Sequence, residues 1–203
     1  MNNYLENLNE EQKLPVLHKD GPLIVIAGAG SGKTRVLTYR IIHLINEGVD
    51  PFNILALTFT NKAALEMKNR ISLITSESVS RSIWMGTFHS IFARILRSEA
   101  PLIGYPTNFT IYDTYDSEKL ISNIIKEKKL DKDTYKAKSI KNRISSLKNN
   151  FITVENYFNN SELIEVDKAA KRDLFGEIYQ EYVRRCFKAS VMDFDDLLLK
   201  TNE

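Results

Sequence analysis

The first half of the chain alternates short apolar runs with longer stretches in which apolar residues recur every three or four positions. Short apolar runs bounded by glycine or polar residues predict buried strands, and the longer stretches predict amphipathic helices between them. This alternation is typical of an α/β fold built on a parallel sheet. The expected strands are residues 23–27, 54–58, 83–86 and 109–112, and the expected helices are residues 34–46, 61–74 and 88–99.

In the second half the strand-like runs stop. Residues such as Leu120, Ile121 and Ile124 follow helical spacing, and similar groups recur without a convincing strand between them. We therefore interpret residues 114–190 as an all-helical subdomain inserted into, or appended to, the α/β layer. Within it, the asparagine-rich residues 149–160 are expected to form a loop.

Composition adds little beyond an uneven distribution of charge. The chain has 203 residues, enough for one or two domains, and its hydrophobic content of 43% and charged content of 27% are ordinary for a globular protein. The formal net charge is +2, but residues 117–150 carry ten Lys or Arg against four Asp or Glu, whereas residues 161–203 carry ten acidic and seven basic side chains. The basic segment suggests a surface for a polyanion, with a solvated lysine-rich helix face as the alternative.

Cysteine usage and hydropathy exclude two classes of protein. Cys186 is the only cysteine, so no intrachain disulfide is possible, and its apolar neighbours Tyr182 and Phe187 suggest a small core residue. No apolar run approaches the roughly 20 residues that span a bilayer. The polar, acidic residues 1–12 do not resemble a signal peptide. We expect a cytoplasmic protein without a membrane partner.

Residues 27–34 read Ala-Gly-Ala-Gly-Ser-Gly-Lys-Thr, between an expected strand and an expected helix. Such a turn presents backbone N–H groups and the positive end of a helix dipole to a polyphosphate. Lys33 then reaches the β- and γ-phosphates, and the Thr34 hydroxyl coordinates Mg²⁺. Ala27 replaces the usual first glycine, which is tolerable if its φ is negative. A chance glycine-rich turn is the alternative, and the flanking strand and helix disfavour it.

Further segments narrow the function, because kinases, GTPases, transporters and motor proteins all carry such a loop. Upstream, the Gln12 amide offers the donor and acceptor that match the edge of adenine, with an exposed helix start as the alternative. Residues 58–64 and 86–90 each follow an expected strand, at the sheet edge where ligands of α/β proteins bind. There Phe59 suits base stacking, with core packing as the alternative. His89 is either a ligand contact or a structural residue.

Together these segments resemble superfamily 1 DNA helicases of the UvrD/Rep/PcrA type, and the resemblance covers essentially the whole chain. Ordered motifs at the spacing of one family are far more specific than any single motif. Residues 8–12 resemble the family's adenine-sensing glutamine motif, residues 27–34 its nucleotide loop, residues 58–64 its motif Ia and residues 86–90 its motif Ib.

The resemblance also implies how the chain is divided. Residues 92–113 and 192–198 are similar to the segments that enter and leave the family's helical 1B subdomain. The implied fold class is α/β, a P-loop NTPase with a RecA-like parallel sheet and an all-helical inserted subdomain. The implied domains are the N-terminal part of ATP-binding domain 1A at residues 1–113, subdomain 1B at residues 114–190, and a return segment to 1A at residues 191–203.

Roles for individual residues follow from the resemblance. It implies that Gln12 and Arg35 hold the adenine end of ATP, and that Lys33 and Thr34 are the catalytic residues, with Thr34 on Mg²⁺. The rest of the ATP-binding loop would be Ala27, Gly28, Ala29, Gly30, Ser31 and Gly32. The implied track for single-stranded DNA consists of Phe59, Asn61, Lys62, Thr87, Phe88 and His89.

The implied function is that of an ATP-dependent 3′ to 5′ DNA helicase, which couples ATP hydrolysis to duplex unwinding in DNA repair or replication. ATP and Mg²⁺ would be its cofactors, and single-stranded DNA and the junction between single- and double-stranded DNA its substrates. The helices within residues 117–150 would face the duplex. Repair or replication proteins are the expected partners, in a cytoplasmic, nucleoid-associated location.

Two parts of such a motor are not expected in this chain. The family's Walker B acids come roughly twenty-five residues after the segment that matches residues 193–198, and the second motor domain comes later. Asp193, Asp195 and Asp196 are poor substitutes, because no apolar strand is predicted before them and a helix start favours acidic residues for capping. We expect this chain alone to turn over little ATP and to form an incomplete sheet.

Two other readings stay open. A truncated, non-catalytic module that binds DNA or a partner protein would bind DNA with a steep salt dependence that Lys33→Ala leaves unchanged. A small-molecule kinase on the same loop would need an acceptor site and a lid. It would not explain residues 58–64 and 86–90 together.

Overall fold

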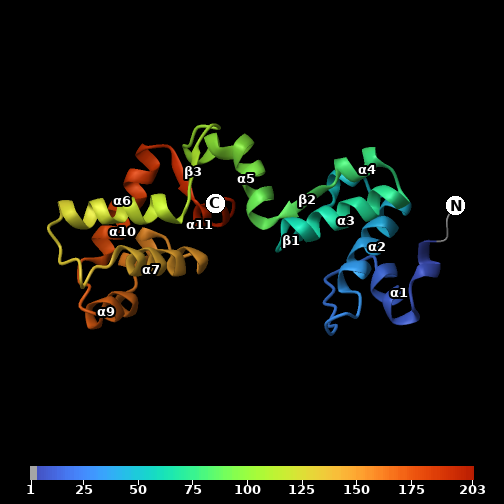
Figure 1. Cartoon of the computed structure of the whole chain (residues 1–203), viewed down its shortest axis with the longest axis horizontal. Helices are drawn as coiled ribbons and strands as arrows, with labels where there is room; N and C mark the ends of the chain where they lie inside the picture. Colours follow the sequence, from blue (N-terminus) through green and yellow to red (C-terminus); the bar gives the residue numbers. More distant parts are fainter. Residues whose placement is uncertain (1–3) are drawn as a thin grey trace. The chain divides into compact units, whose positions relative to one another are not determined.

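The computed structural model describes residues 4–203. They divide into two compact units, the first ending at Ile91 and the second spanning Phe92–Glu203 (Figure 1). The division falls within helix α5 (Phe88–Glu99). The chain is a mixed α/β protein that is mostly helical and has small parallel sheets. The boundaries expected at residues 113 and 190 stay a prediction. Among the described residues, no helix is long and apolar enough to cross a bilayer.

The first unit contains one two-stranded parallel sheet surrounded by helices. Strand β1 pairs with strand β2 in a register that sets Leu55 opposite Trp84 and Thr58 opposite Thr87. The elements in chain order are η1 (Tyr4–Asn7), α1 (Glu10–Leu17), α2 (Lys33–Asn46), η2 (Pro51–Asn53), β1 (Leu55–Thr58), α3 (Asn61–Ile74), α4 (Glu77–Ser82) and β2 (Trp84–Thr87). The strands and helices expected between residues 34 and 99 are confirmed to within a residue or so.

Residues 23–27 do not form the expected strand. They have no regular secondary structure and belong to neither sheet, and the side chains of Ile24 and Ile26 are 87% and 95% exposed. A strand is held by hydrogen bonds to a neighbouring strand, and β1 pairs only with β2 in the described chain. The apolar run therefore has β propensity without a partner, and the parallel sheet expected to contain it is incomplete.

The core of the first unit lies between helices α2 and α3 and the two strands. Ile42 and Ile71 are fully buried there, because apolar residues at helical spacing face the sheet. Thr60 caps the N-terminus of α3 by accepting a hydrogen bond from the backbone N–H of Ala63 at 3.2 Å. The other core members are Ile41, Ile54, Ala56, Met67 and Ile83.

The second unit is a helical bundle closed by a second short parallel sheet. The helical interpretation of residues 114–190 is confirmed, but residues 149–160 contain a helix, α8, and are not all loop. After α5 the elements are η3 (Ala100–Ile103), β3 (Thr110–Tyr112), α6 (Thr114–Glu127), α7 (Ala137–Asn149), α8 (Val154–Phe158), α9 (Ser161–Ala169), α10 (Phe175–Lys188), β4 (Val191–Asp193) and α11 (Phe194–Leu199).

Strand β4 corrects the expectation that no strand precedes the acidic residues near position 193. Its three residues are all buried, and it pairs in parallel with β3 so that Tyr112 lies opposite Asp193. A strand of three residues is too short to show an alternating pattern, so tertiary pairing decides it. The bundle core beside it is aromatic and aliphatic, and it includes the buried Cys186 as expected.

Candidate nucleotide and nucleic-acid site

Residues 28–32 form the turn that leads into helix α2. Gly30 and Gly32 have φ values of +80° and +90°, which only glycine adopts at little cost. Gly32 is the N-cap of α2, so the first backbone N–H groups of a 14-residue helix point out of this turn. Neither Gly28 nor Ala27 has a positive φ, which agrees with the alanine at the first loop position. The turn is built as an anion-binding helix N-terminus requires.

Lys33 lies across this turn. Its exposed ammonium donates to the carbonyl oxygens of Ala27 at 2.9 Å and Gly28 at 2.7 Å. The Ser31 hydroxyl also donates to the Gly28 carbonyl, at 2.7 Å. These bonds hold the Lys33 ammonium against the backbone of the turn, and they place a cation beside the N-terminus of helix α2. Thr34 is exposed in the first turn of the helix.

Gln12 connects helix α1 to the loop. Its side-chain amide donates to the Ser31 carbonyl at 3.1 Å, while its carbonyl oxygen accepts from the backbone N–H of Asn9 at 3.3 Å. The Asn9 side chain accepts from the Gln12 N–H in return, at 2.8 Å, which completes a capping box. Gln12 therefore both starts α1 and contacts the loop. The exposed helix start that sequence reasoning set against a binding role is in fact combined with loop contact.

Arg35 opens onto a hollow between α2 and α3. Its guanidinium lies 5.7 Å from the centre of the Tyr39 ring, within range of a cation–π contact. A cavity of about 350 Å³ is lined by these two residues together with Arg70, Leu73 and Ile74. Two guanidinium groups beside an aromatic ring suit a planar, anionic or electron-rich ligand. Sequence reasoning missed Tyr39 and Arg70, which carry no motif of their own.

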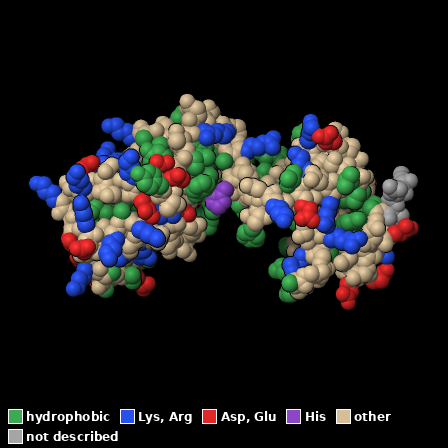
Figure 2. Space-filling model, viewed as in Figure 1, with side chains coloured by type: hydrophobic (Ala, Val, Ile, Leu, Met, Phe, Trp, Pro, Cys, Tyr) green, Lys and Arg blue, Asp and Glu red, His purple; other side chains and the backbone are tan. Residues whose placement is uncertain are grey.

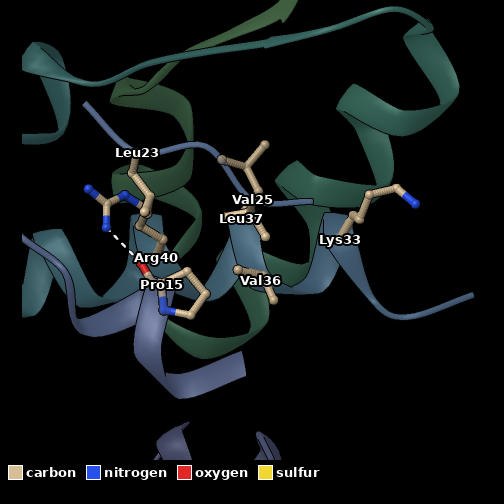
Figure 3. A pocket seen from close by; sticks show the side chains of 7 residues that line it. All are labelled: Pro15, Leu23, Val25, Lys33, Val36, Leu37 and Arg40. Carbon is tan, nitrogen blue, oxygen red and sulfur yellow. Dashed lines mark hydrogen bonds between the residues drawn. The ribbon is translucent and has the colours of Figure 1, made fainter. Parts of the chain in front are cut away.

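A second cavity, of about 370 Å³, lies on the other side of α2 (Figure 3). Its lining is mainly apolar, and the Lys33 ammonium points away from the other side chains that line it. Arg40 donates to the Pro15 carbonyl at 2.7 Å, which fixes α1 against α2 at one edge. The other lining residues are Leu23, Val25, Val36 and Leu37. The cavity therefore lies between residues 23–25 and helix α2, and its apolar lining does not suit a phosphate.

The carboxyl ends of β1 and β2 bring two of the expected DNA-contacting segments together. Because Thr58 pairs with Thr87, the residues that follow each strand emerge at the same edge. Phe59 is 93% exposed, which rules out core packing, and its ring centre lies 5.7 Å from that of Phe88. Two aromatic rings at a sheet edge offer stacking surfaces for bases.

The polar members of these segments flank the aromatic pair. Asn61 and Lys62 are exposed in the first turn of α3, and His89 is half-buried in the first turn of α5. The Thr87 hydroxyl donates to the Ser90 hydroxyl at 3.0 Å. All six expected DNA-contacting residues therefore lie at the ends of β1 and β2 or in the helices that begin there.

Asp193 and Asp196 are engaged inside the second unit. Both are buried and cap helix α11 reciprocally, and the ammonium of Lys148 lies 2.7 Å from an oxygen of each. Asp195 accepts from the Asn149 amide at 2.9 Å. These contacts support the expectation that the three acids have a structural role. Among the described residues, no group of three or more His, Cys, Asp or Glu is arranged to hold a metal ion.

Part of the basic charge of residues 117–150 is paired with acids of the same unit. Lys128 pairs with Glu177, Arg143 with Asp167 and Lys148 with the acids of α11, so three of its ten cations are neutralised within the unit. Figure 2 shows blue side chains spread over the visible face with red ones among them. A single continuous basic surface is not seen on this face, and a surface for a polyanion on residues 117–150 stays a prediction.

Comparison with known proteins identifies the family. The family model described as UvrD/REP helicase N-terminal domain matches residues 8–203. The chain is 42% identical to the ATP-dependent DNA helicase PcrA of Staphylococcus epidermidis over 99% of its own length, and 43% identical to that of Bacillus subtilis over 98%. It spans 27% and 26% of those two proteins, about a quarter of each. The match confirms the resemblance on which the site was sought, and the chain belongs to the UvrD/REP helicase family.

Proposed function

We propose that this chain is the ATP- and DNA-binding N-terminal part of an ATP-dependent 3′ to 5′ DNA helicase, which unwinds duplex DNA in repair or replication. The observation that carries the proposal is the parallel pairing of β1 with β2, which sets Phe59 beside Phe88 at one sheet edge. The PcrA relatives are named as ATP-dependent DNA helicases, which supports the same activity. A cytoplasmic location and repair or replication partners accompany that activity.

The nucleotide half of the proposal rests on the turn at residues 28–32. Its positive-φ glycines and the free N-terminus of α2 fit a polyphosphate, and the exposed Thr34 hydroxyl is available to Mg²⁺. To reach the β- and γ-phosphates, Lys33 exchanges its bonds to the Ala27 and Gly28 carbonyls for phosphate oxygens. Bound Mg²⁺ would neutralise developing charge on the phosphates.

The adenine end of ATP would lie near Gln12 and Arg35. The Gln12 amide must release the Ser31 carbonyl to present its donor and acceptor to the base. Arg35 and Tyr39 line a cavity large enough for a purine, with Arg70 across it. The amide that would bind the base is the one that contacts the loop in this structure, so base recognition and phosphate binding would be coupled through Gln12.

The DNA half rests on the aromatic pair, in which Phe59 is exposed and Phe88 is half-buried. Bases of a single strand would stack on Phe59 and Phe88, and Asn61, Lys62, Thr87 and His89 would contact the backbone. Each stacked base contributes about 1–3 kcal/mol, independent of sequence. Such a surface suits a motor that moves along DNA of any sequence.

A second candidate is a nucleic-acid-binding module that does not turn over ATP. It is favoured by the contacts of Asp193 and Asp196 with Lys148, which withdraw these two carboxylates from metal-assisted hydrolysis. The two candidates share the DNA site and differ in whether nucleotide binding affects it.

The test is binding of a labelled oligothymidylate and of an ATP analogue by this 203-residue chain. Phe59→Ala should weaken DNA binding about tenfold or more and leave ATP binding unchanged. Phe52→Ala is the matched control, since Phe52 is also exposed on the first unit but lies away from β1's carboxyl end, in η2. Equal DNA affinity of both variants would reject the DNA site.

The nucleotide site is tested by Lys33→Ala, with the exposed Lys68→Ala of α3 as its control. Lys33→Ala should abolish binding of the ATP analogue, and Lys68→Ala should leave it unchanged. Loss of ATP binding with an unchanged DNA affinity, whether or not nucleotide is present, would favour the non-catalytic module over the motor.

A further inference from the structure

Within the second unit, the segments that lead into and out of the helical bundle lie side by side. Strand β3 leads into the helical bundle and pairs with β4, which leads out of it. Helix α7 ends beside them and packs against α11. We call this meeting point of β3, β4, the end of α7 and the start of α11 the neck. A contact here decides how firmly the bundle is attached to its return segment.

A buried ion cluster lies in the neck. The side chain of Lys148, at the end of α7, is 1% exposed, and its ammonium lies 2.7 Å from Asp193 Oδ2 and 2.7 Å from Asp196 Oδ1. The Tyr182 hydroxyl of α10 donates to the same Oδ2 of Asp193 at 2.8 Å. Each aspartate carboxylate also accepts a hydrogen bond from the backbone N–H of the other aspartate, at 2.8 Å for Asp193 and 3.1 Å for Asp196. Four elements therefore meet on a single ammonium and two carboxylates.

The charges of this cluster do not balance when both carboxylates are ionised. One lysine then faces two aspartates, which leaves an excess negative charge in a site closed to water. Burial opposes ionisation of Asp193, but Lys148 outweighs it and lowers the pKa of that carboxyl. For Asp196, burial together with the charge of Asp193 prevails, and the pKa is raised to about 6. One of the two carboxylates thus holds a proton under mildly acidic conditions.

We propose that Lys148, Asp193, Asp196 and Tyr182 form a proton-linked latch, in which uptake of one proton by the aspartate pair tightens the neck. With the proton bound, one ammonium faces one carboxylate and one neutral carboxyl, so no charge is left without a partner. Without it, the second carboxylate relies on backbone N–H groups and the N-terminus of α11. The latch is a property of the second unit and does not depend on the proposed function.

Other titrating groups near the latch do not imitate it. The three histidines of the chain are His18, His43 and His89, and all precede the second unit. Burial raises the pKa of Tyr179 and of Cys186 to about 12, and that of Tyr105 and Tyr182 further still. The remaining charged groups beside the pair are Asp195 on α11, Asp113 before α6 and Lys141 on α7, which share a small hollow with Asp193.

The direction of the pH effect follows from the raised pKa of Asp196. The pKa of Asp196 is about 6 in the folded state, above its usual value of 3.8, so the folded state binds this proton more tightly than the unfolded state does. The proton therefore stabilises the fold at low pH, and this contribution is lost as pH rises through about 6. Asp193 has the opposite effect and loses its contribution as pH falls toward 3.8 and below. The neck is therefore tightest between roughly pH 4 and pH 6.

The experiment is hydrogen exchange of the full chain between pH 7.5 and pH 5.0, corrected for the intrinsic exchange rate. Protection of the β4 and α11 amides should rise about tenfold on acidification, as a single group with a pKa of about 6 requires. Asp196→Asn, which mimics the protonated form, should remove this rise. Asp195→Asn is the control, because its carboxylate contacts Asn149 and not Lys148, and it should keep the rise.

A second measurement on the unmodified chain covers the case in which Asp196→Asn fails to fold. Carbon-13 NMR of the aspartate carboxyl groups should show one resonance of the second unit that titrates with a midpoint near pH 6. If every aspartate of that unit titrates below pH 5, or if Asp196→Asn keeps the full rise in protection, the latch is rejected.

Discussion

The two units of this chain treat their polar and apolar groups in opposite ways. The second unit buries a lysine, two aspartates and a tyrosine hydroxyl and satisfies them with one another. The first unit leaves Ile24 and Ile26 almost fully exposed beside the turn that would bind phosphate. The helical unit thus pairs this buried cluster internally, whereas the unit that carries the candidate site has an apolar segment without a strand partner. The buried ion cluster and the candidate ligand site therefore lie in different units of the chain.

The comparison is tested most severely by Lys148→Met, which removes the cation and leaves two buried carboxylates. We expect the second unit to lose about 3–5 kcal/mol of unfolding free energy at pH 7.5, because an unpaired buried charge is costly. Urea denaturation followed by the fluorescence of tyrosines in that unit measures the change. Lys168→Met, which breaks an exposed pair with Glu165, should cost less than about 1 kcal/mol. Equal costs for both variants would mean that the cluster is not closed to solvent.

Gly86→Ala tests how closely strand β2 of the first unit packs against the start of helix α5. A Cβ at this buried position would lie 2.6 Å from the Ser90 hydroxyl and 3.2 Å from Ile91. We expect a loss of about 1–3 kcal/mol in thermal or urea unfolding, since overpacking forces β2 and α5 apart. The double variant with Ser90→Ala should recover part of the loss. A neutral Gly86→Ala would show that the strand end yields more easily than the geometry implies.

Gly32→Ala separates the conformation of the turn from its composition. Gly32 has a φ of +90°, and an added Cβ would approach the Gln12 amide nitrogen to 2.9 Å. The left-handed conformation should cost roughly 1–2 kcal/mol in the alanine variant. Binding of an ATP analogue, measured by calorimetry, should weaken with it. Gly28→Ala is the control, because that position has ordinary φ and open space around it. If both variants bind alike, the turn does not require glycine at its helix start.

The smallest effect is expected for Ile24→Asp. The side chain is 87% exposed, so the substitution should change the unfolding free energy of this chain by no more than about 0.5 kcal/mol. Ile42→Asp, in the core of the same unit, is the matched contrast and should prevent the unit from folding. A large cost of Ile24→Asp, seen by circular dichroism on heating, would mean that the segment is paired in solution.

Sequence reasoning located the candidate site better than it located the sheet. The glycine turn, Gln12 and the segments after β1 and β2 are local patterns, and local patterns carry turn and cap chemistry directly. The prediction of a strand at residues 23–27 was wrong, because a strand needs a neighbouring strand to pair with and apolar periodicity does not reveal one. Strand β4 was missed for the same reason.

The Lys148 cluster could not have been found from the chain alone. Lys148 and Asp193 are 45 residues apart in the sequence, and a lysine at the end of a polar helix is normally exposed. The basic count over residues 117–150 likewise does not reveal that three of its ten cations are paired with acids elsewhere in the unit. Charge along a sequence predicts surface potential only where the fold leaves the charges on the surface.

The exposed run at residues 23–26 also affects how this chain behaves in concentrated solution. Four consecutive branched aliphatic residues, with no charge among them and no strand partner, leave backbone groups and apolar surface available to the same segment of another molecule. Two molecules that meet there can exchange the hydrogen bonds that neither makes alone. We therefore expect self-association that increases with protein concentration and that is suppressed by a charge at position 24, because this segment has no strand partner in the described chain.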